Sequence, residues 1–143
     1  MKKIIVFLII SLFLTSCWEI EKTENKNIIN KDFSKQFFAQ ISIWDFKKEL
    51  ENSEVVLLDV RTPWELVEFW KIRENQKLID INEDDFSSEI KKLDKTKKYI
   101  VYCWHGNRSS TAREFMKKSW FNYVKDLKGG IDAWVDAWEN VIK

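Results

Sequence analysis

Short apolar segments that alternate with helix-like segments constrain the fold of this chain most strongly. Residues 55–58 (Val-Val-Leu-Leu) and 99–102 (Tyr-Ile-Val-Tyr) are continuous apolar runs, which are typical of strands buried on both faces of a sheet. Between them, Pro63 suits the first turn of a helix, and Phe86, Ile90 and Leu93 recur at helical spacing. This alternation with short connections predicts an α/β fold, with a parallel sheet and helices on both of its faces.

The same pattern predicts where the individual elements lie. Ser42 is a good N-cap, with Asp45 three residues further on, and Gly129-Gly130 forms a turn before the last helix. The expected strands are residues 37–41, 55–58, 78–81, 99–102 and a last strand from residue 123. The expected helices are residues 43–50, 63–69, 86–93, 109–118 and 131–137.

Length and charge exclude several classes of protein. The chain has 143 residues, which favours one compact domain. Lys plus Arg is 24 and Asp plus Glu is 23, so the chain lacks the basic surplus of a general nucleic-acid-binding protein. Two cysteines and one histidine exclude a disulfide-rich scaffold and argue against a metal site. We therefore expect neither a nucleic-acid partner nor a metal or other cofactor.

The N-terminus has the pattern of a secretory signal. Lys2 and Lys3 precede an apolar stretch, residues 4–14, which is followed by the small residues Thr15 and Ser16 and by Cys17. The stretch is shorter than the roughly 20 residues that span a bilayer. Its end resembles the lipobox of bacterial lipoproteins, which implies cleavage before Cys17 and a diacylglycerol on its sulfur. The alternative is an ordinary cleaved signal with an incidental cysteine.

These N-terminal features predict the domain organisation and the location of the protein. We expect a signal peptide over residues 1–16, a lipidated cysteine and polar tether over residues 17–36, and the folded domain over residues 37–143. Acyl chains on the cysteine would hold the domain at a membrane surface by burying their methylene groups. The expected location is the cell envelope, with the domain outside the cytoplasm.

Cys103 is the candidate that carries chemistry. It directly follows the predicted strand 99–102 and precedes a predicted helix, and sites in open α/β sheets form beyond the carboxyl ends of strands. Backbone amides of a loop that curls into a helix, together with the Arg108 guanidinium, favour an anion at the loop centre. They would therefore favour a reactive thiolate at Cys103. The alternative is a buried, inert cysteine at a strand end.

The loop residues after Cys103 are candidates for binding an anionic substrate. They are Trp104, His105, Gly106, Asn107 and Arg108. His105 is the only histidine of the chain and could act as a general base. A single histidine in a turn is more often a loop residue, and we favour that role.

Three sequence blocks resemble the rhodanese family of sulfurtransferases. They are residues 58–63 followed by Glu65, residues 101–110 and residues 127–134, in the order and spacing of that family over about residues 38–140. The resemblance implies a three-layer fold with a five-stranded parallel sheet, and a persulfide carried on Cys103. A donor such as thiosulfate would supply the sulfur, and cyanide or a thiol would accept it.

The resemblance also implies where Asp59 and Arg61 lie. Both follow the strand that pairs with the strand before Cys103, so they should border the same mouth as substrate-binding candidates. For catalysis we favour structural roles, in which Asp59 ties loops together and Arg61 pairs with an acid.

Loop length and the cysteine count separate the alternative activities. Four residues lie between Cys103 and Arg108, one fewer than in related phosphatases that enclose a tetrahedral phosphate, so sulfur transfer is favoured over phosphatase chemistry. Arsenate reduction would need a resolving thiol, which the chain lacks once Cys17 is acylated. A domain that carries a persulfide or binds a partner without turnover is the remaining alternative, although Cys103 and Arg108 favour an enzyme.

Tryptophan replaces glycine at several places where the resembled family has glycine. The chain has 8 Trp and only 3 Gly. Trp70, Trp120 and Trp138 follow predicted helices, where a left-handed residue is preferred, and a non-glycine residue there costs roughly 1–2 kcal/mol. One hypothesis is that these positions are UGA codons read as glycine in the source organism. Trp18, Trp64 and Trp104 are further candidates, whereas Trp134 matches the family; the alternative is a tryptophan-rich lineage with adapted turns.

Overall fold

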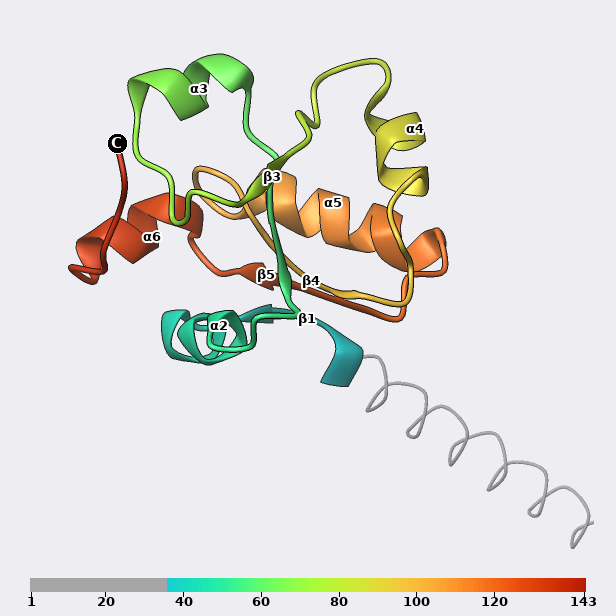
Figure 1. Cartoon of the computed structure of the whole chain (residues 1–143), viewed down its shortest axis with the longest axis horizontal. Coiled ribbons are helices and arrows are strands. Elements are labelled where there is room, and N and C mark those ends of the chain that lie inside the picture. The colour runs from blue at the N-terminus through green and yellow to red at the C-terminus, as the bar shows by residue number, and fades with distance from the viewer. Residues whose placement is uncertain (1–35) are drawn as a thin grey trace, which may run out of the picture. The chain divides into compact units, whose positions relative to one another are not determined.

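The computed structural model describes residues 36–143, of which Phe37–Lys143 form one compact unit. Its centre is a parallel sheet in the order β1-β5-β4-β2-β3 (Figure 1). The strands are β1 (Phe38–Ile41), β2 (Val56–Asp59), β3 (Lys77–Leu78), β4 (Lys98–Tyr102) and β5 (Tyr123–Leu127). The predicted parallel α/β architecture is confirmed. The predicted signal over residues 1–16, Cys17, Trp18 and the tether before residue 36 lie outside the described residues.

Helices follow the strands as the sequence pattern predicted. They are α2 (Ile43–Leu50), α3 (Pro63–Glu68), α4 (Phe86–Lys91), α5 (Asn107–Lys118) and α6 (Gly130–Asp136). The Ser42 side chain caps α2 by accepting from the N–H of Asp45. At α3, Thr62 directly before Pro63 and Glu65 two residues after it form a reciprocal capping box. Local sequence signals therefore position the start of both helices.

Two apolar cores cover the two faces of the sheet. Successive β2 residues, Leu57 and Leu58, belong to different cores because side chains alternate along a strand. α4 and α5 pack in one core, and α2 and α6 in the other; Figure 1 shows α2 and α5 on opposite sides of the strands. The result is the expected three-layer arrangement.

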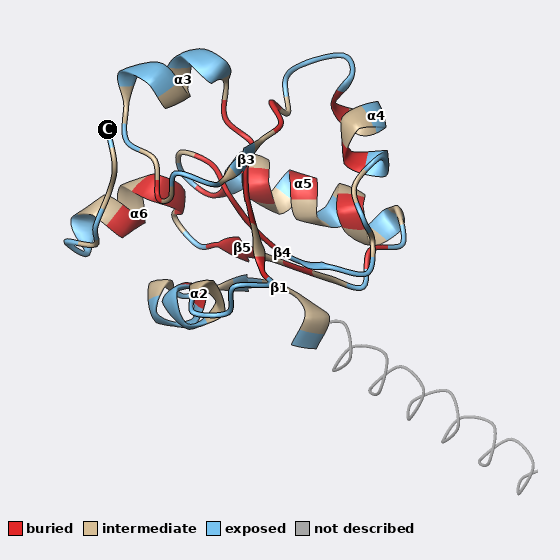
Figure 2. Cartoon of the chain, viewed as in Figure 1, coloured by how far each residue is buried: buried red, intermediate tan, exposed pale blue. Residues whose placement is uncertain are grey.

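Helix α3 differs from its neighbours in burial. None of its residues is buried, whereas β4 is buried from its second residue onward; Figure 2 shows this contrast between α3 and the strands. Trp64 and Val67 of α3 are exposed. This helix is therefore held by its ends and by individual polar contacts rather than by a buried apolar face.

The three tryptophans predicted at left-handed helix ends behave differently. Trp120 and Trp138 have φ values of 67° and 58°, and they are the non-glycine residues with positive φ within residues 36–143. The prediction is wrong for Trp70, whose φ is not positive. Helix α3 ends instead at Phe69 in an extended conformation, so the chain leaves this helix without a left-handed residue.

The third strand and two helices also differ in length from expectation. Strand β3 covers only Lys77–Leu78, although the N–H groups of Ile79 and Ile81 still donate to the carbonyls of Asp59 and Val60. Helix α4 ends at Lys91, and α5 begins at Asn107, two residues earlier than predicted. Within residues 36–143, no helix is long and apolar enough to cross a membrane.

Candidate active site

Cys103 lies directly beyond the carboxyl end of β4. The N–H of Gly106 donates a hydrogen bond to its Sγ over 3.1 Å, and Sγ lies 3.6 Å from Oγ of Ser109. The residue is 1% exposed. The sulfur is therefore enclosed, but it is held by polar groups of the loop and of the first turn of α5.

The turn before α6 holds the Cys103 loop from behind. The N–H of Ile131 donates to the Cys103 carbonyl over 2.9 Å, and that of Asp132 donates to the Trp104 carbonyl over 3.2 Å. A Cβ on Gly130 would lie 2.5 Å from the Cys103 carbonyl oxygen, so only glycine allows this approach. Because a trans peptide holds its N–H opposite its carbonyl, the amides of Trp104 and His105 point away from α6.

Arg108 has a carboxylate partner that the sequence analysis did not assign to the site. Its two terminal nitrogens donate to the two carboxylate oxygens of Glu65 over 2.8 Å and 2.6 Å. The Arg108 hydrogen bonds hold the pKa of Glu65 at about 2, with further lowering by Thr62 against the opposing effect of burial. The guanidinium therefore faces Glu65, whereas the sequence predicted that it faces an anion at the loop centre.

Asp59 and Arg61 form a buried ion pair beside the loop. Nη2 of Arg61 lies 2.7 Å from the Asp59 carboxylate, and both side chains are fully buried. The same nitrogen donates to the carbonyl of Trp70 over 2.8 Å, and Gln76 donates to Asp59 over 3.0 Å. These contacts are the structural roles that the sequence favoured for the two residues.

Arg61 also touches the Cys103 loop through its guanidinium face. That group lies over the Trp104 ring at 5.8 Å and over the Tyr102 ring at 5.2 Å. Within the part of the chain that the structure describes, its Nη1 is a buried nitrogen without a hydrogen-bond partner. The Arg61 guanidinium therefore contacts both the Asp59 carboxylate and the ring of Trp104 in the Cys103 loop.

The other predicted loop residues form the rim. The Trp104 ring makes an edge contact with Phe69 at 4.6 Å. His105 is 66% exposed, and its Nδ1 lies 2.7 Å from the carboxylate of Asp132 on α6. Asn107 is exposed, and its carbonyl accepts from the hydroxyl of Thr111, one turn further along α5. This exposed position on the loop fits the role of a loop residue that the sequence favoured for His105.

A buried polar chain behind the sulfur was missed by sequence reasoning. Oγ of Ser109 lies 3.1 Å from the Gly106 carbonyl and 3.4 Å from the carboxylate of Asp126 on β5. Asp126 is fully buried, and burial raises its pKa against the lowering by Arg113. Gln40 on β1 also donates to Asp126. Asp126 lies two residues after the apolar Val124 and so on the same face of β5, and this buried-face carboxylate was the signal that could have pointed to these polar contacts.

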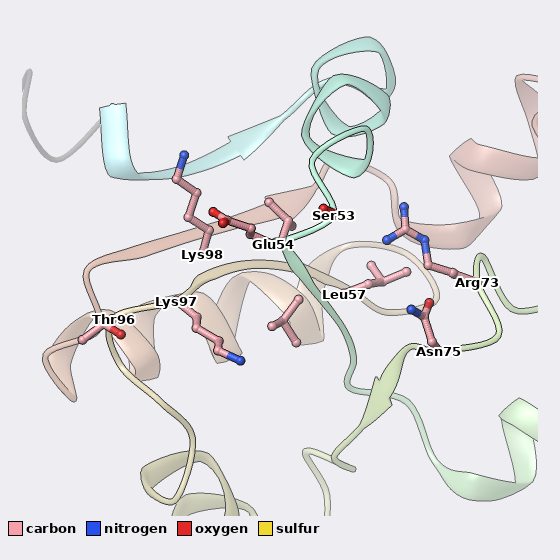
Figure 3. A pocket seen from close by; sticks show the side chains of 10 residues that line it. Ser53, Glu54, Leu57, Arg73, Asn75, Thr96, Lys97 and Lys98 are labelled. Carbon is pink, nitrogen blue, oxygen red and sulfur yellow. The ribbon is translucent and has the colours of Figure 1, made fainter.

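A separate cavity lies at the other end of the strands. It has a volume of about 520 Å³ and is lined where β2 and β4 begin, by residues that include Glu54, Arg73, Asn75, Lys97 and Lys98 (Figure 3). Since Cys103 follows the carboxyl end of β4, this cavity is not part of the cysteine site. Within residues 36–143, no group of three or more potential metal ligands is present.

These features define a class of protein, namely a parallel α/β domain whose cysteine lies in a strand-to-helix loop. A sequence model of the rhodanese-like domain matches residues 42–137, and the chain belongs to that family.

Solved structures show the same likeness. A rhodanese-related protein from Thermoplasma volcanium is 33% identical, with 73% of this chain and 98% of that chain covered and a TM-score of 0.64. The polysulfide-sulfur transferase homodimer from Wolinella succinogenes is 25% identical, with 85% and 90% covered and a TM-score of 0.62. A rhodanese-like domain protein from Staphylococcus aureus is 28% identical, with 67% and 90% covered and a TM-score of 0.57.

Proposed function

We propose that the domain is a sulfurtransferase that moves sulfane sulfur through a persulfide on Cys103. The observation that carries the proposal is the hydrogen bond from the Gly106 N–H to Sγ, because such a donor stabilises negative charge on sulfur. Membership of the rhodanese-like family and the likeness to a polysulfide-sulfur transferase support the same activity.

The proposed reaction has two steps at one sulfur atom. The Cys103 thiolate attacks the outer sulfur of thiosulfate, the S–S bond of the donor breaks, and its electron pair leaves with sulfite. A thiolate or cyanide then attacks the outer sulfur of the persulfide and regenerates the Cys103 thiolate. No redox partner is needed, since each step exchanges one sulfur–nucleophile bond for another.

The enclosure of Cys103 supports sulfur transfer over phosphatase chemistry. A residue that is 1% exposed suits a single sulfur atom better than a tetrahedral phosphate. Arg108, which would have to bind such a phosphate, is already paired with both oxygens of Glu65. A phosphatase assay with a small aryl phosphate should therefore give no turnover that depends on Cys103.

A second candidate is a domain that holds a persulfide without catalytic turnover. The Arg108–Glu65 pair favours this alternative, because it removes a free cation from the mouth of the site. Mass spectrometry after thiosulfate treatment tests both functions at once. A gain of one sulfur on Cys103 that is absent in Cys103→Ser supports persulfide formation, and release of that sulfur to cyanide over many cycles distinguishes the enzyme from the carrier. A wild-type domain that gains no sulfur would refute both.

We further propose that a lipid on Cys17 anchors the domain at the cell envelope. The support is the N-terminal sequence: two lysines, an apolar stretch and small residues before the cysteine. Membrane fractionation of the full chain, with Cys17→Ser as the control, tests the anchor. The proposal predicts an acylated N-terminal peptide beginning at Cys17, and an unmodified peptide in the membrane fraction would contradict it.

A further inference from the structure

The charge beside the proposed nucleophile depends on a contact between α3 and α5. Arg108 lies in the first turn of α5, between Gly106 and Ser109, which both contact the Cys103 sulfur. Its two terminal nitrogens, however, bind both oxygens of Glu65, and such bidentate pairs are strong and well oriented. The side chains are only 28% and 14% exposed, so water screens the negative charge of Glu65 incompletely. The positive charge of Arg108 is therefore largely neutralised by Glu65 when a donor approaches the sulfur.

We propose that Glu65 makes the site select sulfur donors by their charge. The site favours monoanionic donors, such as alkyl persulfides and thiosulfonates, over the thiosulfate dianion. The inference rests on the proposed sulfurtransferase function. The donor and the Cys103 thiolate are both negative, and each additional negative charge on the donor is repelled by the thiolate and by Glu65. Were Arg108 free, it would offset this repulsion.

Glu65 keeps this charge at every pH at which the protein would work. The Arg108 hydrogen bonds hold the pKa of Glu65 at about 2, and the pKa of Arg108 is raised chiefly by its hydrogen bond to Glu65. The capping box adds rigidity, because the Glu65 carboxylate also accepts from the N–H of Thr62 over 2.9 Å. The carboxylate is thus held by α3 itself and cannot simply turn away when a donor enters.

Two donors of different charge test the proposal. Thiosulfate is a dianion and the methanethiosulfonate anion carries one charge; both give up their outer sulfur to a thiolate, with sulfite or methanesulfinate as the leaving group. The measured quantity is the ratio of kcat/KM for thiosulfate to kcat/KM for methanethiosulfonate. In Glu65→Gln this ratio should rise about tenfold, as expected for one unit charge at a partly exposed site. In the matched control Glu68→Gln, on the same helix but exposed, it should stay at the wild-type value.

A second pair of variants covers the case in which Glu65→Gln does not fold. Arg108→Gln leaves Glu65 without its cation, so the ratio should fall below the wild-type value. The double variant Glu65→Gln with Arg108→Gln should return it toward wild type, because the two charges act through each other. A ratio that is the same in every folded variant would overturn the proposal. Loss of the sulfur gain on Cys103 with both donors in the wild type would instead refute the proposed function.

A second inference rests on the backbone at the ends of α5 and α6. After α5, the N–H of Trp120 donates to the Lys117 carbonyl over 3.2 Å, and the N–H of Phe121 donates to the Met116 carbonyl over 3.3 Å. These two bonds are the Schellman motif, whose left-handed residue is usually glycine. Here that residue is Trp120, with φ 67°. Phe121 and Met116 are both buried in the same core, and apolar residues at these two positions frequently accompany the motif.

The end of α6 repeats this geometry. The N–H of Trp138 donates to the Val135 carbonyl over 2.9 Å, and the N–H of Glu139 donates to the Trp134 carbonyl over 3.2 Å. Trp138 has φ 58°. The indole of Trp138 is 94% exposed and that of Trp120 is 83% exposed, so neither side chain gains packing that offsets the left-handed strain.

We infer that the natural chain carries glycine at positions 120 and 138, encoded by UGA codons that its source reads as glycine. The codons and the peptides of the native protein test the inference together. We expect UGA codons at positions 120 and 138 and a UGG codon at position 134. We also expect native peptides that contain glycine at positions 120 and 138. UGG at positions 120 and 138, or tryptophan in the native peptides, would overturn it. Trp134 is the matched reference because it is buried in α6.

Discussion

The N–H of Gly106 donates to Sγ of Cys103 over 3.1 Å, and Gly106 reaches this position with a φ of 93°. A residue with a side chain would strain the backbone there, and its Cβ would also lie 2.9 Å from the Gly129 nitrogen and 3.2 Å from the Leu127 carbonyl oxygen. Only glycine at this position can therefore place its backbone N–H against the Cys103 sulfur without strain.

Replacement of this glycine should remove persulfide formation. In Gly106→Ala the left-handed conformation costs about 1–2 kcal/mol, and the clash with Gly129 shifts the loop away from Sγ. We expect the rate of sulfur gain on Cys103 to fall by at least about tenfold, because a hydrogen bond to a charged group is worth about 1.5–3 kcal/mol. Mass spectrometry over time after thiosulfate addition measures this rate. Unchanged kinetics in a folded Gly106→Ala domain would contradict the role of the amide.

The Glu65–Arg108 pair should make stability depend on acid. In the unfolded chain Glu65 takes up a proton near its ordinary pKa of 4.5, whereas in the folded domain its pKa is about 2. The stabilisation is therefore present above about pH 4.5 and is lost as the pH falls toward 2. With solvent screening, we expect the pair to contribute about 1–2 kcal/mol to the free energy of unfolding at neutral pH.

Urea unfolding at several pH values between 7 and 2 checks this dependence. The free energy of unfolding should fall more for the wild-type domain than for Glu65→Gln over the acid range. The difference between the two proteins should therefore shrink at low pH. Parallel loss of stability in both proteins would show that other carboxylates cause the acid sensitivity.

Glycine at positions 120 and 138 should stabilise the domain. Each of Trp120→Gly and Trp138→Gly removes a left-handed penalty of about 1–2 kcal/mol, and little packing is lost because both indoles are exposed. Trp44→Gly is the matched control, since Trp44 is 69% exposed but lies inside α2, where glycine is unfavourable. Thermal unfolding should show a higher Tm for the first two variants and a lower Tm for the control. A lower Tm in all three would mean that the exposed indoles contribute to stability.

The buried pair of Asp59 and Arg61 should behave as a structural unit. Arg61→Met leaves the carboxylate of Asp59 buried without its cation, and breaking such a pair costs about 3–5 kcal/mol. The double variant Asp59→Leu with Arg61→Met should recover part of that loss, because it leaves no unpaired buried charge. Urea unfolding of the single and double variants measures the difference. A double variant that is less stable than either single variant would argue against this explanation.

His105 should contribute little to the transfer of sulfur. Its Nδ1 pairs with Asp132 at the surface. Removal of a general base would lower the rate by about 100-fold or more. We expect His105→Gln to keep kcat/KM for thiosulfate within a few-fold of wild type. A loss of the size typical for a general base would assign His105 a catalytic role.

Local signals in the sequence were enough for much of the fold and for the centre of the site. The apolar runs at β2 and β4 predicted buried strands, and Ser42 and Pro63 predicted where helices start. The position of Cys103 followed from the same pattern, because it comes directly after β4. The left-handed residues at 120 and 138 were predicted from the expected helix ends together with the glycines of the resembled family at these positions. Trp70 was the exception: α3 ends at Phe69 in an extended conformation, and the Trp70 carbonyl accepts from Arg61, a contact that the local sequence does not show.

Contacts between distant segments were decided by tertiary structure. Glu65 and Arg108 are 43 residues apart, and Ser109 and Asp126 meet only because α5 packs beside β5. The strand order that places β2 next to β4 brings the buried pair of Asp59 and Arg61 beside the cysteine loop. The sequence by itself determined most of the elements and the position of the candidate nucleophile, since both follow from periodicity and backbone preferences along the chain. Only the packing of those elements decided which charges from distant segments face each other, as with Glu65 and Arg108, because such partners depend on the order and packing of the elements. Asp59 and Arg61, in contrast, are only two residues apart.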